Sequence, residues 1–187
     1  MGLANWLTTL RILLIPVFVT LLVYRRPGPA LGVFCLASLT DLLDGWIARG
    51  GHGRQTRLGA FLDPVADKLL LTSAYVTLTY LRILPFWLTA IVVSRDLIIS
   101  VGVLVIHVAG GSVHPTPSWL GKASTALQMV TVLVAMLLQG GDSPTVLRAF
   151  AYATAAFTIA SGLQYIVQGH KQLSAHADPQ MGRGSKA

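Results

Sequence analysis

Four aspartates occur as two closely spaced pairs between residues 41 and 67. Asp41 and Asp44 are three residues apart and Asp63 and Asp67 are four apart, so each pair falls on one face of a helix. Four converging carboxylates repel one another unless cations offset their charge. An all-carboxylate set suits hard ions such as Mg²⁺ or Mn²⁺, and two such ions form the usual clamp for displacement at phosphorus.

The residues around the first pair have small or basic side chains. Gly45 and Ala48 continue the face of the pair with almost no side chain, so a large ligand could approach the backbone there, and Arg49 adds a cationic fork. Each feature has an ordinary explanation when it is taken alone. Small residues also pack helices together, and Asp67 beside Lys68 could form a surface ion pair. The combined spacing favours a metal and phosphate site.

The second pair predicts its own helix start. Asp63 precedes Pro64, a pattern typical of an N-cap followed by proline at the first helical position. On this interpretation Asp63 alone could be no more than a cap. A hairpin would join this helix to the one before it, so we expect the two aspartate pairs to lie at a similar depth.

The elements that must position these residues are apolar helices. The 187 residues are 53% hydrophobic and 11% charged, and the mean hydropathy is +0.66. All seven acids are aspartate. Apolar stretches near the ~20 residues that span a bilayer run over Leu7–Tyr24, Ala30–Ala48, Pro64–Leu81, Pro85–Val108, Trp119–Leu138 and Thr145–Gln168. We therefore predict an all-α integral membrane protein with six transmembrane helices and the active site between helices 2 and 3.

Charge distribution predicts the orientation and the domain limits. With the N-terminus in the cytoplasm, seven basic residues fall on the cytoplasmic side and four on the other, which also places the C-terminus and the active site on the cytoplasmic side. Asn5, Thr8 and Arg11 share one side of a helix, as in an interfacial N-terminal segment. One domain is expected over 1–169, with a polar disordered tail over 170–187. The net charge of +7 is spread along an apolar chain, which argues against nucleic acid as a partner.

The two pairs form part of a longer pattern. Asp41-x-x-Asp44-Gly45-x-x-Ala48-Arg49, nine further residues and Gly59-x-x-x-Asp63-x-x-x-Asp67 resemble the complete signature of the CDP-alcohol phosphotransferases. The resemblance implies a membrane enzyme, commonly homodimeric, that moves a phosphatidyl group from a CDP-linked donor to an alcohol. It implies two divalent ions held by all four aspartates, with Asp67 also the general base. It also implies that the CDP donor is bound by Asn5, Thr8, Asp41, Gly45, Ala48, Arg49, Thr56 and Gly59.

Two basic residues suggest what the acceptor carries. Arg95 and Lys122 fall inside predicted spans, where cations usually line a functional cavity, and a phosphate on the acceptor is what they would hold. The alternative is that Arg95 pairs with Asp96 and Lys122 extends to the membrane surface. The stretch from Gly121 to Gln128 resembles phosphatidylglycerophosphate synthases, whereas the Ser-Arg-Asp sequence that ends at Asp96 resembles cardiolipin synthases.

The leading prediction is a phosphatidyltransferase that uses CDP-diacylglycerol and glycerol 3-phosphate and releases CMP, in a bacterial inner membrane. The alternative within the family is a cardiolipin synthase with phosphatidylglycerol as acceptor. A hypothesis of another class is a small cation or proton transporter that uses the aspartate cluster. Arg49, Thr56 and Gly59 have no role in a transporter, so the enzyme is favoured.

Overall fold

The chain folds into six α-helices, with no strand among the residues that the structure describes. This computed structural model describes residues 3–49, 57–108, 119–138 and 144–177, and their side chains over 9–40, 68–102, 119–138 and 145–167. The helices are α1 (Leu3–Val23), α2 (Pro27–Arg49), α3 (Arg57–Tyr80), α4 (Phe86–Val108), α5 (Trp119–Leu137) and α6 (Pro144–Ala177). The predicted all-α class is confirmed.

Two helix boundaries differ from the predicted ones by more than one and a half helical turns, while the others agree within about one turn. Helix α3 begins at Arg57, so Asp63 and Pro64 lie within it, and the prediction of Asp63 as an N-cap is wrong. A proline inside a helix gives up one backbone hydrogen bond, a loss that packed membrane helices tolerate. Helix α6 continues to Ala177 and so includes eight residues of the predicted tail, with its last residue two before Pro179.

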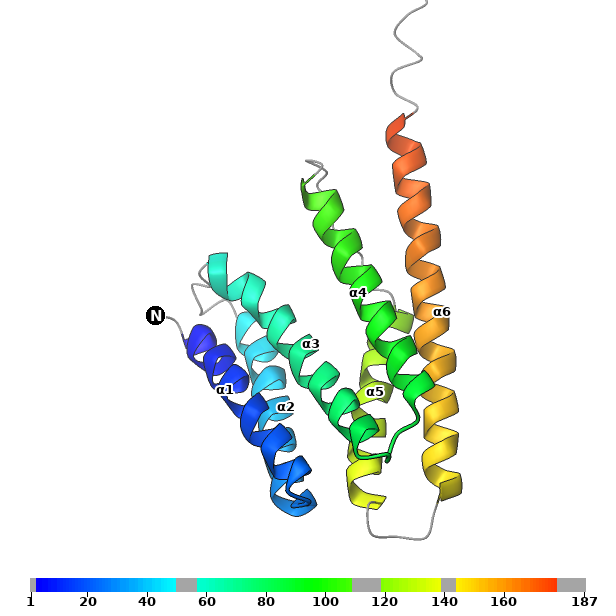
Figure 1. Cartoon of the computed structure of the whole chain (residues 1–187). Helices are drawn as coiled ribbons and strands as arrows, with labels where there is room; N and C mark the ends of the chain where they lie inside the picture. Colours follow the sequence, from blue (N-terminus) through cyan, green and yellow to red (C-terminus); the bar gives the residue numbers. More distant parts are fainter. Residues whose placement is uncertain (1–2, 50–56, 109–118, 139–143, 178–187) are drawn as a thin grey trace, which may run out of the picture.

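The helices form two groups (Figure 1). Helix α1 packs against α2 and α3, while α6 packs against α4 and α5, and α3 contacts both α4 and α5. Helix α2 ends and α3 begins at the upper end of the left-hand group of helices in Figure 1, which we call the motif end. The turns between α1 and α2 and between α3 and α4 lie at the opposite end, where α6 also begins.

Helix α1 ends in a Schellman motif. The backbone N–H of Arg26 donates to the carbonyl of Leu21 at 2.9 Å, and the N–H of Arg25 donates to that of Leu22 at 3.0 Å. Arg25 adopts a left-handed backbone with φ of 53°. Glycine usually occupies this position because a side chain there is crowded by the backbone.

Helix α3 ends in the same way. The N–H of Ile83 donates to the carbonyl of Leu78 and the N–H of Arg82 to that of Thr79, both at 2.9 Å. Arg82 has φ of 59°. Among the described residues, Arg25 and Arg82 are the non-glycine residues with positive φ, so both left-handed helix ends carry arginine.

Exposed and buried side chains are arranged as in a membrane protein. Large apolar side chains are exposed on every helix, for example Leu13, Leu36, Val76, Ile98, Leu137 and Ile166. Several polar side chains, by contrast, are fully buried: Arg11, Ser124, Gln128, Thr131, Thr154 and Thr158. An apolar outer surface of this extent would be a liability in water and suits contact with lipid. Within the described residues, two helices are long and apolar enough to cross a membrane by composition, over Trp119–Leu137 and Thr145–Val167.

Candidate active site

Both aspartate pairs fall on the helix ends that meet at the motif end. Asp41 and Asp44 lie in the last turns of α2, which ends at Arg49, and Asp63 and Asp67 lie in the first three turns of α3. At 1.5 Å per residue, Asp44 is about 8 Å and Asp63 about 9 Å from the adjacent helix end. The backbone therefore brings the two pairs to a similar depth, as the hairpin predicts.

The side chains of the motif lie outside the described part of the structure. The helical backbone includes these positions of the predicted site: Asn5, Thr8, Asp41, Gly45, Ala48, Arg49, Gly59 and Asp67, together with Asp44 and Asp63. Thr56 lies outside the described residues altogether. The roles of these residues in metal and donor binding stay predictions.

The chemistry of the donor set fits a divalent cation. Carboxylate oxygens are the ligands that Mg²⁺ and Mn²⁺ prefer. The two pairs offer four carboxylates on two adjacent helix ends, and neither helix end offers a cysteine or histidine that would favour zinc. Among the described side chains, no three of the types His, Cys, Asp and Glu gather into a metal-binding group.

Arg11 is buried, whereas the sequence pattern predicts that it lies in an interfacial segment. Its side chain is fully buried in α1, one helical turn after Thr8. Helix α1 packs against both α2 and α3, the helices that carry the four aspartates. A buried cation is costly without anionic neighbours, which makes Arg11 a candidate for the site. Its three-residue spacing from Thr8, and of Thr8 from Asn5, is the signal that could have identified it.

A buried ionic cluster joins α3, α4 and α6. The Oδ1 atom of Asp96 accepts hydrogen bonds from Lys68 Nζ and from Arg95 Nη1, both at 2.8 Å. The Nη2 atom of Arg95 donates to the hydroxyl of Ser161 at 2.8 Å. Arg95 and Asp96 are both buried, whereas the Lys68 side chain keeps 30% of its surface exposed. Lys68 directly follows Asp67, so the cluster adjoins the second aspartate pair.

This ionic cluster has an excess of positive charge. Two cations share one carboxylate, and Asp96 is the sole acid among the described side chains. Arg95 Nε and Asp96 Oδ2 are buried without a hydrogen-bond partner in the structure. A guanidinium has five N–H donors, so the bonds to Asp96 and Ser161 leave others for a ligand. The pairing of Arg95 with Asp96 is the one that the alternative explanation of Arg95 predicts.

Lys122, the second residue predicted to bind the acceptor, forms no hydrogen bond or ion pair with the described side chains of the ionic cluster. It falls in the first turn of α5, its side chain is exposed, and it forms no ion pair with a described residue. Lys68 instead supplies the second cation beside Arg95. In the sequence, Lys68 is the neighbour of Asp67, with which it could form a surface ion pair, and it is not among the predicted acceptor residues.

A second buried polar region lies between α5 and α6. Gln128 Nε2 donates to Thr158 Oγ1 at 3.2 Å, and the hydroxyls of Ser124 and Thr158 are 3.2 Å apart. Thr131 Oγ1 donates to a carbonyl one turn earlier, so Thr154 is the donor in the 2.6 Å bond between the two threonines. We call these five residues the hydroxyl seam. All five are fully buried and uncharged.

Fold and motif together define a class: a helical membrane-type protein with two aspartate pairs on adjoining helix ends. The model of the CDP-alcohol phosphatidyltransferase family matches residues 1–160. The chain therefore belongs to the CDP-alcohol phosphatidyltransferase family, which is membrane-bound, and the predicted family is confirmed.

Three named relatives illustrate its range. Human cardiolipin synthase (CMP-forming) is 34% identical over 93% of this chain, which spans 64% of that protein's length. The probable phosphatidylglycerophosphate synthase of Mycobacterium tuberculosis H37Rv is 34% identical over 92% of this chain and 83% of its own. The CDP-diacylglycerol–glycerol-3-phosphate 3-phosphatidyltransferase of Shigella flexneri is 36% identical over 86% of this chain and 90% of its own. Both predicted subfamilies are therefore represented.

Proposed function

We propose that this protein transfers the phosphatidyl group of CDP-diacylglycerol to a hydroxyl of glycerol 3-phosphate and releases CMP. The observation that carries the proposal is the complete aspartate motif on the adjoining ends of α2 and α3, in a chain that matches the family model over residues 1–160. The bacterial relatives whose names include this activity or its product match this chain over most of their own length. Family membership also favours an enzyme over a transporter.

The four aspartates would hold two divalent ions, Mg²⁺ or Mn²⁺. When bound, such ions supply charge neutralisation at the donor pyrophosphate. Gly45 and Ala48 would leave room for the nucleotide beside the backbone. The other residues that would bind the CDP donor are Asn5, Thr8, Arg49, Thr56 and Gly59. These assignments rest on the matching motif positions and on the oxygen-rich donor set.

Asp67 would take the proton of the acceptor hydroxyl. The hydroxyl oxygen then forms a bond to the β-phosphorus of the donor, and the bond from that phosphorus to the bridging oxygen breaks, so that CMP leaves with the electron pair. Lys68 follows Asp67 on α3 and is partly exposed, and Arg95 lies across Asp96 from it. The ionic cluster begins one residue after the proposed base, and its excess positive charge would attract a phosphate-bearing acceptor.

Arg95 and Lys68 would bind the phosphate of the acceptor. The support is the cluster's net positive charge and its unused buried N–H group. Lys122, which is exposed at the start of α5, would attract the acceptor from the membrane surface. This assignment favours an acceptor that carries phosphate over a neutral alcohol.

Phosphatidylglycerol is the second candidate acceptor, which would make the protein a cardiolipin synthase. Two observations favour it: the similarity to the human enzyme, and aspartate at position 96, which cancels one of the two cations. The remaining single positive charge could serve a phosphodiester as well as a phosphomonoester. Both reactions transfer to a glycerol hydroxyl and release CMP.

The membrane arrangement is part of the proposal. Helices of 21 to 24 residues, as α1 to α4 are, measure about 32–36 Å and match the hydrocarbon thickness, and each carries exposed apolar side chains. We infer six spans, with the motif end and both termini in the cytoplasm of a bacterial cell, and a homodimer over domain 1–169.

A panel of acceptors tests the function. Purified protein is incubated with CDP-diacylglycerol, Mg²⁺ or Mn²⁺, and either glycerol 3-phosphate or phosphatidylglycerol, and CMP is measured. We expect CMP only when both a divalent ion and glycerol 3-phosphate are present. Release of CMP with phosphatidylglycerol but not with glycerol 3-phosphate would establish the second candidate. If neither acceptor caused release of CMP, the proposal would be overturned.

A further inference from the structure

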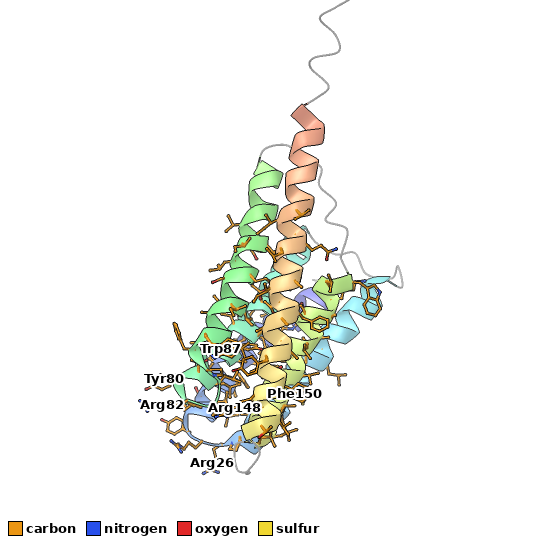
Figure 2. All side chains as sticks on the ribbon, turned by 90° about the vertical axis from the view of Figure 1, so that its right-hand side faces the viewer. Arg26, Tyr80, Arg82, Trp87, Arg148 and Phe150 are labelled. Atoms are coloured by element: carbon orange, nitrogen blue, oxygen red, sulfur yellow. The ribbon has the colours of Figure 1, made fainter. Side chains whose placement is uncertain are left out.

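Four exposed arginines gather at the end of the bundle opposite the motif. Arg25 and Arg26 form the turn between α1 and α2, Arg82 lies in the turn between α3 and α4, and Arg148 lies near the start of α6. Figure 2 shows Arg26, Arg82 and Arg148 at this end. None of the four forms an ion pair with a described residue, and the single described carboxylate, Asp96, is buried in the ionic cluster. We call this surface the arginine end.

Aromatic side chains lie within about one helical turn of these arginines in the sequence. The exposed rings are Tyr24, Tyr80, Phe86, Trp87 and Tyr152. Trp87 of α4 stacks on Tyr152 of α6 with ring centroids 5.4 Å apart, and Tyr152 lies four residues after Arg148. Tyrosine and tryptophan collect at the depth of lipid headgroups, where the ring is in apolar surroundings and the polar atom reaches water. The aromatic rings therefore place the arginines level with the headgroups.

Two of the arginines hold their positions at a conformational cost. Arg25 and Arg82 occupy the left-handed position of a Schellman motif, where glycine would be unstrained. Arginine side chains contribute nothing to closing either helix end, because the hydrogen bonds are made by the backbone. The folding of these turns thus gives no reason for a guanidinium at either position.

We propose that the arginine end binds the phosphate groups of anionic phospholipids in the adjoining leaflet. Guanidinium groups pair with phosphate oxygens through two parallel N–H bonds, and unpaired cations at a membrane surface are attracted to anionic lipid. We take the occupant to be a lipid and not a free phosphate ion, because a lipid would also cover the exposed rings beside the arginines, which a free ion would leave uncovered. This binding surface is at the opposite end from the aspartate motif and does not depend on the catalytic proposal.

The test replaces both strained arginines with glycine. The wild-type chain and the Arg25→Gly/Arg82→Gly variant are reconstituted in phosphatidylcholine bilayers that contain spin-labelled phosphatidylserine or spin-labelled phosphatidylcholine. Phosphatidylserine is anionic and is neither donor nor acceptor in the proposed reaction. Spin-label spectra give the fraction of each lipid held at the protein surface. We expect the wild type to retain phosphatidylserine preferentially, and we expect this preference to be roughly 25-fold lower in the variant, about fivefold for each cation removed.

Stability and charge controls make the result specific. Because glycine relieves the left-handed backbone, the variant should have an unchanged or higher unfolding temperature in neutral detergent, which separates loss of binding from loss of fold. The control Lys171→Gln/Arg183→Gln removes two cations from the C-terminal region and should keep the wild-type preference. The proposal is overturned if the glycine variant retains phosphatidylserine as the wild type does, or if the control loses it equally.

Discussion

The ionic cluster and the hydroxyl seam are both buried between membrane-type helices, yet they differ in charge and in how well their polar atoms are paired. Each residue of the seam donates or accepts a hydrogen bond within α5 and α6, and the sum of charges is zero. The ionic cluster has two cations for one carboxylate and leaves Arg95 Nε and Asp96 Oδ2 unpaired. A neutral set whose polar atoms are mostly paired needs no counter-ion, whereas an excess of buried charge does.

The difference separates what holds the helices together from what serves the reaction. Helices in lipid gain little from apolar burial against one another, so small polar side chains contribute to their association. The seam fits that role, with Gln128 Oε1 as its one unpaired buried atom. Intramembrane charges, by contrast, are costly and mark functional sites. The cluster's position beside Asp67 agrees with a role in the reaction.

The sharpest test of this contrast is Asp67→Asn. The amide cannot take a proton from the acceptor, so we expect kcat to fall by roughly 10²–10⁴-fold, while CDP-diacylglycerol still binds. CMP release measures turnover, and binding of radiolabelled donor measures affinity. Turnover near the wild-type value would remove Asp67 as the base and would weaken the link between the ionic cluster and the chemistry.

Asp96→Asn should have the next largest effect. It leaves Arg95 and Lys68 buried or half-buried without a counter-charge, which we expect to lower the free energy of unfolding by about 3 kcal/mol, a loss that glycerol 3-phosphate should partly reverse. Thermal unfolding in detergent with and without that ligand provides the measurement. Asp96→Glu keeps the charge and serves as the matched control. Equal stability of the Asn variant and the wild type would contradict a counter-ion role for Asp96.

Arg95→Ala should act mainly on acceptor binding. Loss of a charge-assisted hydrogen bond of about 1.5–3 kcal/mol predicts a KM for glycerol 3-phosphate that rises roughly 10- to 100-fold, with a smaller change in kcat. Ser161→Ala is the control, since it removes one partner of Arg95 and keeps the guanidinium. Steady-state kinetics over a range of acceptor concentrations decides the point. An unchanged KM in Arg95→Ala would make Arg95 a structural ion-pair residue.

The sequence predicts the helices and the motif because both depend on local patterns. Apolar stretches of nearly 20 residues give six helices, and the spacing of the aspartates places them on the two helix ends at the motif end. The start of α3 was predicted wrongly, because the pattern of Asp63 and Pro64 is compatible with a cap as well as with a helix interior. Local spacing does not distinguish the two cases.

The ionic cluster could be predicted only in part. The pairing of Arg95 with Asp96 joins chain neighbours and is one of the two explanations that the sequence offers for Arg95. Lys68, however, is 28 residues from Asp96, and Ser161 is 66 from Arg95. Those contacts depend on how α3, α4 and α6 pack, which no periodicity within one helix determines. The burial of Arg11 depends in the same way on the packing of α1 against α2 and α3.

Thr158→Val tests the other half of the comparison and should have the smallest effect. The substitution keeps the shape of the side chain and removes the hydroxyl that contacts Ser124 and Gln128, so we expect the free energy of unfolding to fall by about 0.6–1.5 kcal/mol, with KM for both substrates unchanged. Thr154→Val, which interrupts the bond to Thr131, is the matched control and should behave alike. A raised KM for glycerol 3-phosphate in either variant would show that the hydroxyl seam also serves acceptor binding, and the separation of a structural region from a reactive one would fail. A lower free energy of unfolding with unchanged KM and kcat would show that the hydroxyl seam has a structural role and no part in the reaction.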